Sequence, residues 1–281
     1  MAESTFERAR FETRLTTRRL GRRLLARASV ASTNDAAWEA LASGAPDGTV
    51  VVADAQTQGR GRGGRRWALA PGRGLALSVL LTSGCDVESA AVAPLGAGLA
   101  LARALEGLGV RAALKWPNDL LVRGRKLSGI LCESRRAAGP AAGGAIVVGV
   151  GVNVGERAED FPDELRGTAT SLALEGAALD RETVAAEFLN ALEPVWGALA
   201  AGERAGILAA WRTRASFWGE AVRVRAPGGT IAGIARGLDP AGGLVLALDD
   251  GREVTVVAGD LEIAGAGSAA AGGEPAAGAG R

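Results

Sequence analysis

The sequence predicts an α+β fold, in which a sheet with helices is followed by a small β module. Segments rich in β-branched residues recur through the first half of the chain, but they do not alternate regularly with helices as a parallel α/β sheet requires. Helical spacing of apolar residues dominates residues 160–215. After Gly219 the sequence changes to short strand patterns between Gly, Pro and Asp turns, which is typical of a small antiparallel barrel.

The N-terminal part is rich in arginine, since residues 1–28 hold eight Arg and three Glu. We expect one helix over residues 8–26, with a phosphate-binding arm as the alternative. Residues 1–28 are too few for a helix-turn-helix domain, which needs about three helices. Ser32 and Asp35 then have the spacing of a capping box, which predicts the start of a helix that ends near Gly44.

The remaining elements are expected from apolar runs and the turns that bound them. Strands are expected at residues 49–53, 75–81, 112–116, 119–123, 126–133 and 145–152, and helices at 88–106 and 181–199. Arg123, Gly124 and Arg125 predict a tight hairpin turn. The β module should contain strands at 221–226, 230–238, 243–248 and 252–257. The chain therefore divides into 1–28, 29–217, 218–264 and a Gly/Ala-rich tail at 265–281, which should be disordered.

The composition excludes several classes of chemistry. The chain has no histidine, so Ser-His and Cys-His catalysis and His-ligated metal sites are excluded. Cys85 and Cys132 are too few for a disulfide framework, and Cys132 lies in an apolar run typical of a core. The net charge is +1, so the chain as a whole has no bias towards nucleic acid or an anionic membrane.

The sequence also lacks the patterns of membrane and export segments. No apolar stretch is long enough to span a bilayer, and the arginine-rich N-terminus has no apolar segment like that of a secretory signal. Glu3, Glu7 and Glu12 argue against a transit peptide. We therefore expect a cytoplasmic protein that does not associate with membranes.

The strongest local signal is the loop Gly59-Arg60-Gly61-Arg62-Gly63-Gly64-Arg65-Arg66-Trp67, called here the Gly-Arg loop, which follows a strand and Gln56. Its glycines permit positive φ angles and close backbone approach, and their amides can surround an anion. Its arginines match phosphate and carboxylate groups, and Trp67 offers a face to a planar base. Gly/Arg segments also occur in disordered nucleic-acid-binding tails. The position of this one between two apolar strands favours an ordered loop at a nucleotide site.

Further polar residues stand at the ends of expected strands. Lys115-Trp116-Pro117-Asn118-Asp119 can present a cation, an amide and a carboxylate together, although an ordinary polar turn has the same composition. Lys126 begins the strand across the hairpin, and Gly129 within that strand indicates close approach by backbone or ligand. Asn153 follows the last strand of the sheet and is also compatible with a turn.

Five segments, taken in order, resemble the motifs of the biotin–protein ligases. They are Ser32-Thr33-Asn34, the Gly-Arg loop, Lys115-Trp116-Pro117-Asn118-Asp119, Lys126-Leu127-Ser128-Gly129-Ile130-Leu131 and Gly149-Val150-Gly151-Val152-Asn153. Thr170-Ser171-Leu172 also looks like a turn of that family. The resemblance implies a catalytic domain at 29–217 related to class II aminoacyl-tRNA synthetases. It also implies an SH3-like barrel at 218–264, where short strands are expected independently.

The resemblance implies a reaction in two steps. The biotin carboxylate attacks the α-phosphate of ATP, with Mg²⁺ as activator, and gives biotinyl-5'-AMP and pyrophosphate. A lysine of a biotin carboxyl carrier protein then attacks the mixed anhydride, and AMP leaves. No protein nucleophile is needed, which fits a chain without histidine. The anhydride must be kept from water, so we expect the Gly-Arg loop to be poorly ordered without ligand and to close over the activated biotin.

The resemblance also implies roles for individual residues. The residues implied to bind biotin are Ser32, Thr33, Asn34, Gln56, Gly59, Arg60, Gly61, Arg62, Lys126 and Gly129. Those implied to bind ATP are Arg60, Arg62, Arg65, Trp67, Lys115, Asn118 and Asn153. The catalytic residues among them are Arg60, Arg62, Lys115 and Lys126, which would stabilise negative charge on the carboxylate and the α-phosphate. Asp119 would help to place Mg²⁺ or would hold its turn.

Two alternatives remain at this point. A lipoate–protein ligase shares the reaction type, but the Gly-Arg loop and the Lys115–Asp119 motif favour biotin. A nucleic-acid-binding protein would use its arginine-rich segments, and the near-zero net charge weighs against it. Some relatives carry an N-terminal DNA-binding domain, which residues 1–28 cannot hold, so we expect no specific DNA binding. Family members often dimerise, so a homodimer is possible.

Overall fold

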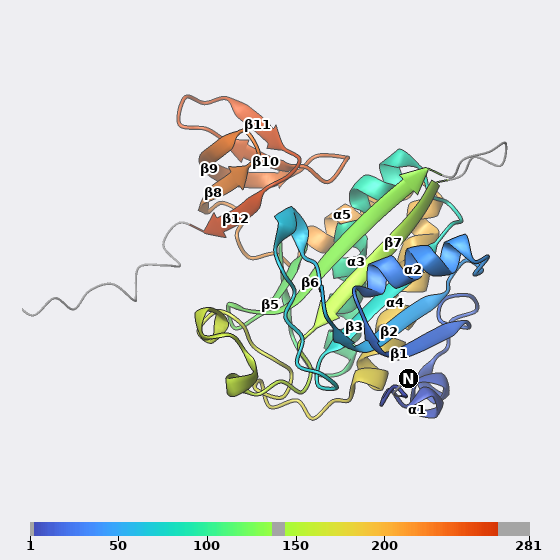
Figure 1. The fold of residues 1–281 in the computed structure, drawn as a ribbon. Coiled ribbons are helices and arrows are strands. Elements are labelled where there is room, and N and C mark those ends of the chain that lie inside the picture. The colour runs from blue at the N-terminus through green and yellow to red at the C-terminus, as the bar shows by residue number, and fades with distance from the viewer. Residues whose placement is uncertain (1–2, 137–143, 264–281) are drawn as a thin grey trace, which may run out of the picture. The chain divides into compact units, whose positions relative to one another are not determined.

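The computed structural model describes residues 3–136 and 144–263, and the chain forms two compact units (Figure 1). The larger unit extends to Ser216 and includes Pro240–Gly242, and the smaller takes Phe217–Asp239 and the residues from Gly243. The tail at 265–281, expected to be disordered, lies outside the described residues. Across 3–136 and 144–263, every helix is too short or too polar to cross a membrane.

The larger unit is built on a seven-stranded mixed sheet with the strand order β1-β2-β3-β7-β6-β5-β4. Its strands are β1 (Leu24–Val30), β2 (Val50–Gln56), β3 (Leu75–Leu81), β4 (Ala113–Lys115), β5 (Asp119–Val122), β6 (Arg125–Arg136) and β7 (Gly144–Val152). The pair β1 and β2 is parallel, and the other neighbours are antiparallel. This arrangement confirms the predicted α+β class, because a sheet of mostly antiparallel strands needs no regular alternation with helices.

Helices cover both faces of this sheet (Figure 1). They are α1 (Arg8–Arg14), α2 (Thr33–Ala42), α3 (Val87–Gly107), α4 (Arg181–Ala200) and α5 (Arg204–Arg212). On one face, Ala37 and Trp38 of α2 pack on Val51, Leu80 and Val147. On the other face, Gly98 of α3 lies close to Leu114 and Ile130 of the sheet. A Cβ added at Gly98 would be 3.3 Å from the Leu114 side chain. The face that carries α2 also carries the candidate site.

Most expected strands of the sheet are confirmed. The apolar run at 75–81 forms β3 with every residue buried, as its lack of polar alternation predicts. The hairpin between β5 and β6 has the predicted turn, in which Arg123 and Gly124 have φ values of 49° and 77°. Both values lie in the left-handed region that a two-residue hairpin turn of this kind requires.

The N-terminal prediction is wrong in two respects. The helix ends at Arg14 instead of residue 26, and Leu24–Val30 forms the edge strand β1. The reason is tertiary pairing, since Leu24 pairs in parallel register with Val50 of β2 and is buried there. The predicted capping box also fails: Ser32 occupies the N-cap of α2, but its side chain makes no capping hydrogen bond.

The segment between β7 and α4 also differs from the helical expectation. It contains only the short 3₁₀ turns η2 (Ala158–Asp160) and η3 (Asp163–Leu165) before α4 begins at Arg181. Its backbone is fixed to the start of β6, where the Lys126 N–H donates to Thr168 O at 2.7 Å and the Thr170 N–H donates to Lys126 O at 2.9 Å. These bonds hold the segment in extended form beside the start of β6, which a helix could not follow.

The smaller unit is a five-stranded antiparallel sheet with the order β11-β10-β9-β8-β12. Its strands are β8 (Ala221–Ala226), β9 (Gly229–Leu238), β10 (Leu244–Ala247), β11 (Glu253–Val256) and β12 (Asp260–Ile263). The first four confirm the expected strands. The fifth, β12, was not expected, because only Leu261 and Ile263 are apolar in its four residues. It pairs with β8 and buries Leu261.

Candidate functional site

A cavity of about 300 Å³ opens on the α2 face of the large sheet. The predicted site residues that line it are Ser32, Thr33, Asn34, Gln56, Arg60, Gly61, Arg62, Arg65, Trp67, Asn118, Asp119, Lys126, Gly129 and Asn153. Gly59 lies in an adjoining hollow under the Gly-Arg loop. Lys115, at the end of β4, does not line this cavity. Residues from five separate motifs therefore meet at one place, and Lys115 stands apart from them.

The floor of the cavity is made of glycine backbone on β6 and β7. A Cβ added at Gly149 would stand 2.2 Å from Asn34 Oδ1, and one added at Gly151 would stand 2.3 Å from the Trp67 ring. A Cβ at Gly129 would be 3.1 Å from the same ring. A side chain at either of the first two positions would collide with residues that line the cavity. Sequence reasoning missed Gly149 and Gly151 as site residues, although their alternation along a strand places both on one face.

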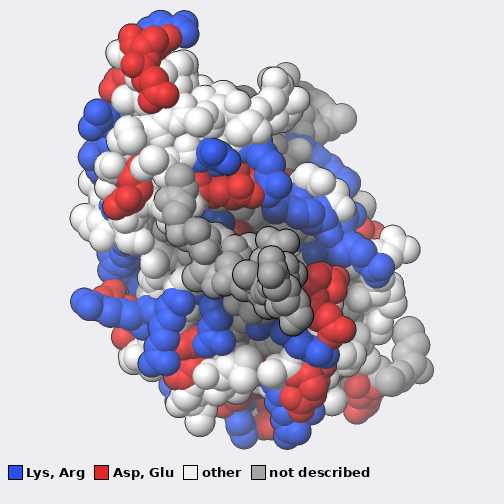
Figure 2. All heavy atoms as spheres, turned by 90° about the vertical axis from the view of Figure 1, so that its left-hand side faces the viewer, with Lys and Arg blue, Asp and Glu red and all other residues white. Residues whose placement is uncertain are grey.

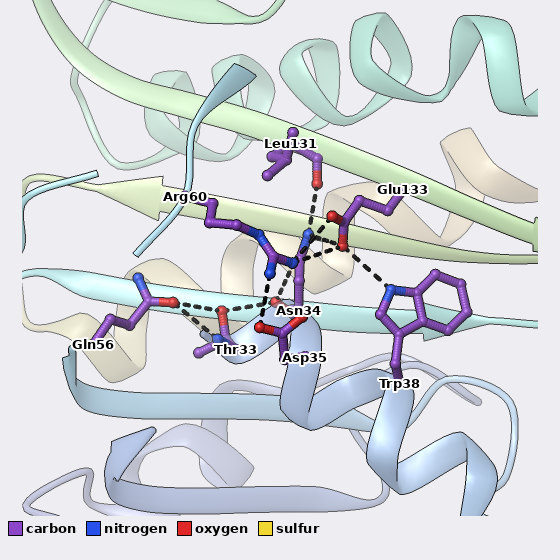
Figure 3. Close-up of polar contacts among 9 residues, drawn as sticks. Thr33, Asn34, Asp35, Trp38, Gln56, Arg60, Leu131 and Glu133 are labelled. Atoms are coloured by element: carbon purple, nitrogen blue, oxygen red, sulfur yellow. Dashed lines mark hydrogen bonds and ion pairs between the residues drawn. The ribbon is translucent and has the colours of Figure 1, made fainter. Parts of the chain in front are cut away.

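The N-terminus of α2 brings neutral polar groups to one end of the cavity (Figure 3). Gln56 Oε1 accepts from the Thr33 backbone N–H at 2.9 Å. The buried Ser78 hydroxyl lies 2.8 Å from Thr33 Oγ1 and donates to Asn34 Oδ1 at 2.7 Å. Asn34 Nδ2 donates to Leu131 O at 3.2 Å. These bonds fix the orientation of the amide and hydroxyl groups, which is what hydrogen-bond recognition of a neutral ligand requires.

Arg60 faces this cluster, but its guanidinium is already engaged (Figure 3). Its Nη1 donates to Asp35 Oδ2 at 2.7 Å, and its Nη2 donates to Glu133 Oε1 at 3.1 Å. The hydrogen bond with Asp35 is the main reason that the pKa of Arg60 lies above its ordinary value. Sequence reasoning missed both carboxylates, since an acid at a helix start and another near a strand end are common on protein surfaces.

The Gly-Arg loop forms a small hairpin between β2 and β3. The Gly61 N–H donates to Arg65 O at 2.7 Å, and the Trp67 N–H donates to Gly59 O at 3.0 Å. Gly63 and Gly64 at the tip have φ values of 63° and 77°, the left-handed conformation that favours glycine. The described loop is thus anchored at its base and turns on glycine at its tip. Its predicted disorder without ligand stays a prediction.

Lys126 stands at the other end of the cavity. Its Nζ lies 2.7 Å from Asp119 Oδ1 and 5.8 Å from the centre of the Trp67 ring. Among the described residues, no group of three or more acidic or cysteine side chains is placed to hold a metal ion. Asp119 is engaged with Lys126, and within the part of the chain that the structure describes it has no companion ligands for a protein-held metal.

Besides Asn34, two further asparagines line the cavity, and both hold backbone. Asn118 Nδ2 donates to Ile130 O at 2.7 Å, and Asn153 Nδ2 donates to Thr170 O at 2.8 Å. Their amide nitrogens thereby fix the turn before β5 and the segment after β7. That segment supplies four lining residues which the sequence did not indicate: Phe161, Leu165, Thr168 and Ala169.

The cysteines offer no nucleophile. Burial is the main cause that raises the pKa of Cys85 to about 11 and that of Cys132 to about 12. Both thiols therefore stay protonated near neutral pH, and neither lines the cavity. This agrees with the expectation that the chemistry uses no protein nucleophile.

Comparison with known proteins gives two family matches. Residues 26–153 match the biotin/lipoate A/B protein ligase family, and residues 217–263 match the biotin protein ligase C-terminal domain. The biotin–[acetyl-CoA-carboxylase] ligase of Mycobacterium tuberculosis is 39% identical over 245 residues, which cover 83% of this chain and 86% of that protein. The bifunctional ligase/repressor BirA of Bacillus subtilis is 33% identical over 251 residues, which cover 89% of this chain and 76% of that protein.

Solved structures agree with these sequence matches. A crystal structure of the biotin protein ligase from Aquifex aeolicus is similar with a TM-score of 0.70 at 26% identity, covering 87% of this chain and 100% of that one. The same ligase in complex with biotin and ATP gives a TM-score of 0.68 at 28% identity, covering 86% of this chain and 98% of that one.

Proposed function

This chain belongs to the biotin protein ligases, and we propose that its cavity joins biotin to ATP and then passes the biotinyl group to a lysine of an acceptor protein. In the first step a biotin carboxylate oxygen bonds to the α-phosphorus, and pyrophosphate leaves. In the second step the acceptor amine bonds to the carbonyl carbon of biotinyl-5'-AMP, AMP leaves, and the amine loses a proton. The observation that carries the proposal is one cavity lined both by neutral hydrogen-bonding groups and by the cations of Arg62 and Lys126.

The end formed by α2 suits the biotin ring. Ser32, Thr33, Asn34 and Gln56 present hydroxyl and amide groups, which can pair with a neutral ureido group without burying a charge. The glycine floor beside them leaves room for the fused bicyclic ring of biotin. We propose these residues as the biotin site.

The opposite end suits the carboxylate and the phosphates. Arg62 of the Gly-Arg loop and Lys126 of β6 both line the cavity. We propose that their fixed positive charge stabilises the carboxylate and the α-phosphate where the two groups meet. Trp67 lies on the glycine floor beside Lys126 and offers a face to the adenylate. Asp119 orients the Lys126 ammonium through their ion pair, so we propose a positioning role for it.

The described residues do not fit a dedicated magnesium site, because Asp119 is paired with Lys126 and no cluster of metal-ligating side chains surrounds it. We propose that Mg²⁺ arrives on the ATP phosphates. The names of relatives refer to acetyl-CoA carboxylase, and we propose the biotin carboxyl carrier domain of such a carboxylase as the acceptor. A cytoplasmic location follows from that partner.

The test is exchange of labelled pyrophosphate into ATP, measured with biotin, with lipoate and with neither. Exchange that depends on biotin supports the proposal. Exchange with lipoate alone would assign the chain to lipoate ligation, and no exchange with either acid would refute activation of the carboxylate. Arg62→Ala and Lys126→Ala should each lower biotin-dependent exchange by about a hundredfold, the effect of losing one charge-stabilising group in an active site.

Arg18→Ala is the matched control for these variants, because it removes an exposed arginine that does not line the cavity. It should leave exchange unchanged. Wild-type exchange rates in both Arg62→Ala and Lys126→Ala would contradict the assignment of the charged end.

A nucleic-acid-binding function is less well supported, since Figure 2 shows Lys and Arg interspersed with Asp and Glu on the visible part of the surface that it draws.

A further inference from the structure

The carboxylates of Asp35 and Glu133 hold the arginine at the base of the Gly-Arg loop. Arg60 bonds Asp35 through Nη1 at 2.7 Å and Glu133 through Nη2 at 3.1 Å (Figure 3). Asp35 belongs to α2 and Glu133 to β6, so the arginine joins the loop to two elements distant in sequence. A guanidinium engaged through both terminal nitrogens has limited capacity left for a substrate phosphate.

Glu133 has further partners on α2. Its Oε2 accepts from Asn34 Nδ2 at 3.0 Å and from the Trp38 indole N–H at 3.2 Å. Arg60 Nη2 also lies 3.3 Å from this oxygen. One half-buried carboxylate therefore accepts from the loop and from the helix that carries the proposed biotin site. A neutral amide of the same shape has one oxygen in place of two, so it cannot accept from all these donors.

The ends of the loop are fixed while its tip projects. Residues Arg60 and Arg66 form an antiparallel bridge at the base, and Trp67 lies on the glycine floor. Between them, residues 62–64 form a 3₁₀ turn in which every residue is exposed or half-buried. Release of Arg60 would free the first strand of this small hairpin and thereby the tip that carries Arg62.

We propose that Asp35 and Glu133 are positioning residues, which hold the Gly-Arg loop over the cavity through Arg60 and so set the affinity for the activated biotin. Arg60 then acts as the anchor of the loop, and Arg62 is the arginine that meets the phosphate. Because the Glu133 carboxylate also accepts a hydrogen bond from Asn34, it couples the loop to the biotin end of the cavity. This inference rests on the proposed ligase function for its kinetic consequences, whereas its structural consequence concerns the free protein.

The alternative is that Arg60 leaves the carboxylates and contacts the reacting groups itself. The two roles predict different kinetics. Loss of an anchor weakens binding in ground state and transition state alike, so it raises KM and leaves kcat nearly constant. Loss of a group that stabilises the transition state lowers kcat.

The experiment compares Asp35→Asn, Glu133→Gln and Arg60→Ala with the wild-type protein, with Glu39→Gln as control. Glu39 is an exposed acid on the same helix, so the control removes one negative charge from α2 without touching the loop. Three quantities are measured: KM and kcat for biotin-dependent pyrophosphate exchange, thermal stability, and the initial rate of tryptic cleavage after Arg62 and Arg65 in the free protein. Trypsin suits the loop because these cleavage sites remain in every variant.

We expect each of the three variants to raise the KM for biotin about three- to tenfold, the net range for loss of one hydrogen bond at a partly exposed site. We expect kcat to stay within about twofold of the wild-type value and tryptic cleavage to accelerate about as much as KM rises. The double variant Arg60→Ala with Glu133→Gln should be no worse than the more affected single variant, because both remove the same link. Glu39→Gln should match the wild type in all three measurements.

A kcat that falls tenfold or more in Arg60→Ala with KM unchanged would overturn the proposal, and so would wild-type cleavage rates in both acid variants. Thermal unfolding shows whether a variant is merely destabilised. If Glu133→Gln does not fold, Asp35→Asn carries the test, since Asp35 is more exposed than Glu133 and forms its ion pair with Arg60 near the surface. The cleavage rates need no substrate, so they test the anchor even if exchange with biotin fails and the proposed function is wrong.

Discussion

At the scale of single residues, the carboxyl of Glu156 is a buried acidic group without a hydrogen-bond partner within residues 3–136 and 144–263. It is 2% exposed, and neither of its oxygens has a hydrogen-bond partner among the described residues. Burial is the main cause that raises its pKa to about 7, and nearby Asp160 adds to the shift while Arg181 opposes it. Glu156 lies against the backbone of Gly74, where a side chain would leave it no room.

The titration of Glu156 should make stability depend on pH. Its pKa is higher in the folded protein than in the unfolded chain, so the folded state binds this proton more tightly. The free energy of unfolding should therefore fall as pH rises from about 4.5 to about 7, by up to about 3 kcal/mol from this group. Glu156→Gln stays neutral, so it should remove this slope and be more stable than the wild type at pH 8.

Denaturant unfolding between pH 5 and pH 8 measures this difference. Glu159→Gln is the control, because Glu159 lies three residues along the same segment and is exposed. It should keep the wild-type slope. Parallel stability curves for the wild type and Glu156→Gln would show that Glu156 titrates normally.

At the scale of elements, strand β7 serves both faces of the sheet. Its residues Val148 and Val150 are buried in the sheet core, while Gly149 and Gly151 alternate with them and form the floor of the cavity. The strand pairs with β6 along its whole length and with β3 from Ile146 to Val152. One segment therefore supplies core packing and the flat surface on which ligands are expected to lie.

Gly149→Ala should block the biotin end without unfolding the sheet. The new methyl would collide with Asn34 Oδ1, whose position is fixed by Ser78, so Asn34 must move. We expect the KM for biotin to rise at least about tenfold, in line with the sensitivity of reactions to small displacements of positioning groups. Gly197→Ala on α4 is the matched control, since nothing lies within 4 Å of its added Cβ. Wild-type KM in Gly149→Ala would place biotin elsewhere.

Individual elements also show which parts of the fold and of the site can be predicted from the sequence. The mostly apolar run of β3 and the turn at Arg123 are local signals, and both were predicted. The strand β1 was missed because it depends on parallel pairing with β2, which is distant along the chain. The arginine-rich sequence around β1 does not indicate this pairing. The motifs placed most site residues, but the link from Arg60 to Glu133 joins positions 73 residues apart, and no spacing rule indicates it.

At the scale of the whole molecule, the cavity belongs to the larger of the two units. A ligand that binds only the folded form stabilises it by an amount set by its concentration relative to Kd, about 2.7 kcal/mol at a hundredfold excess. Biotin with ATP should therefore raise the melting temperature of the transition that includes the larger unit. Scanning calorimetry with and without both ligands measures this shift, and Lys126→Ala should reduce it. An equal shift with ATP alone would argue against a biotin site.

The order of strands in the large sheet has a consequence for biosynthesis. The central pairing joins β3 to β7, and the chain between them includes a long helix and a hairpin. On the ribosome, β1, β2 and β3 emerge well before β7 can complete the sheet, so one edge of β3 waits unpaired. During this time the nascent Gly-Arg loop lacks the glycine floor of β6 and β7, against which Trp67 lies in the folded protein. Substrate therefore cannot guide early folding, and protection of that waiting edge depends on the speed of translation or on a chaperone.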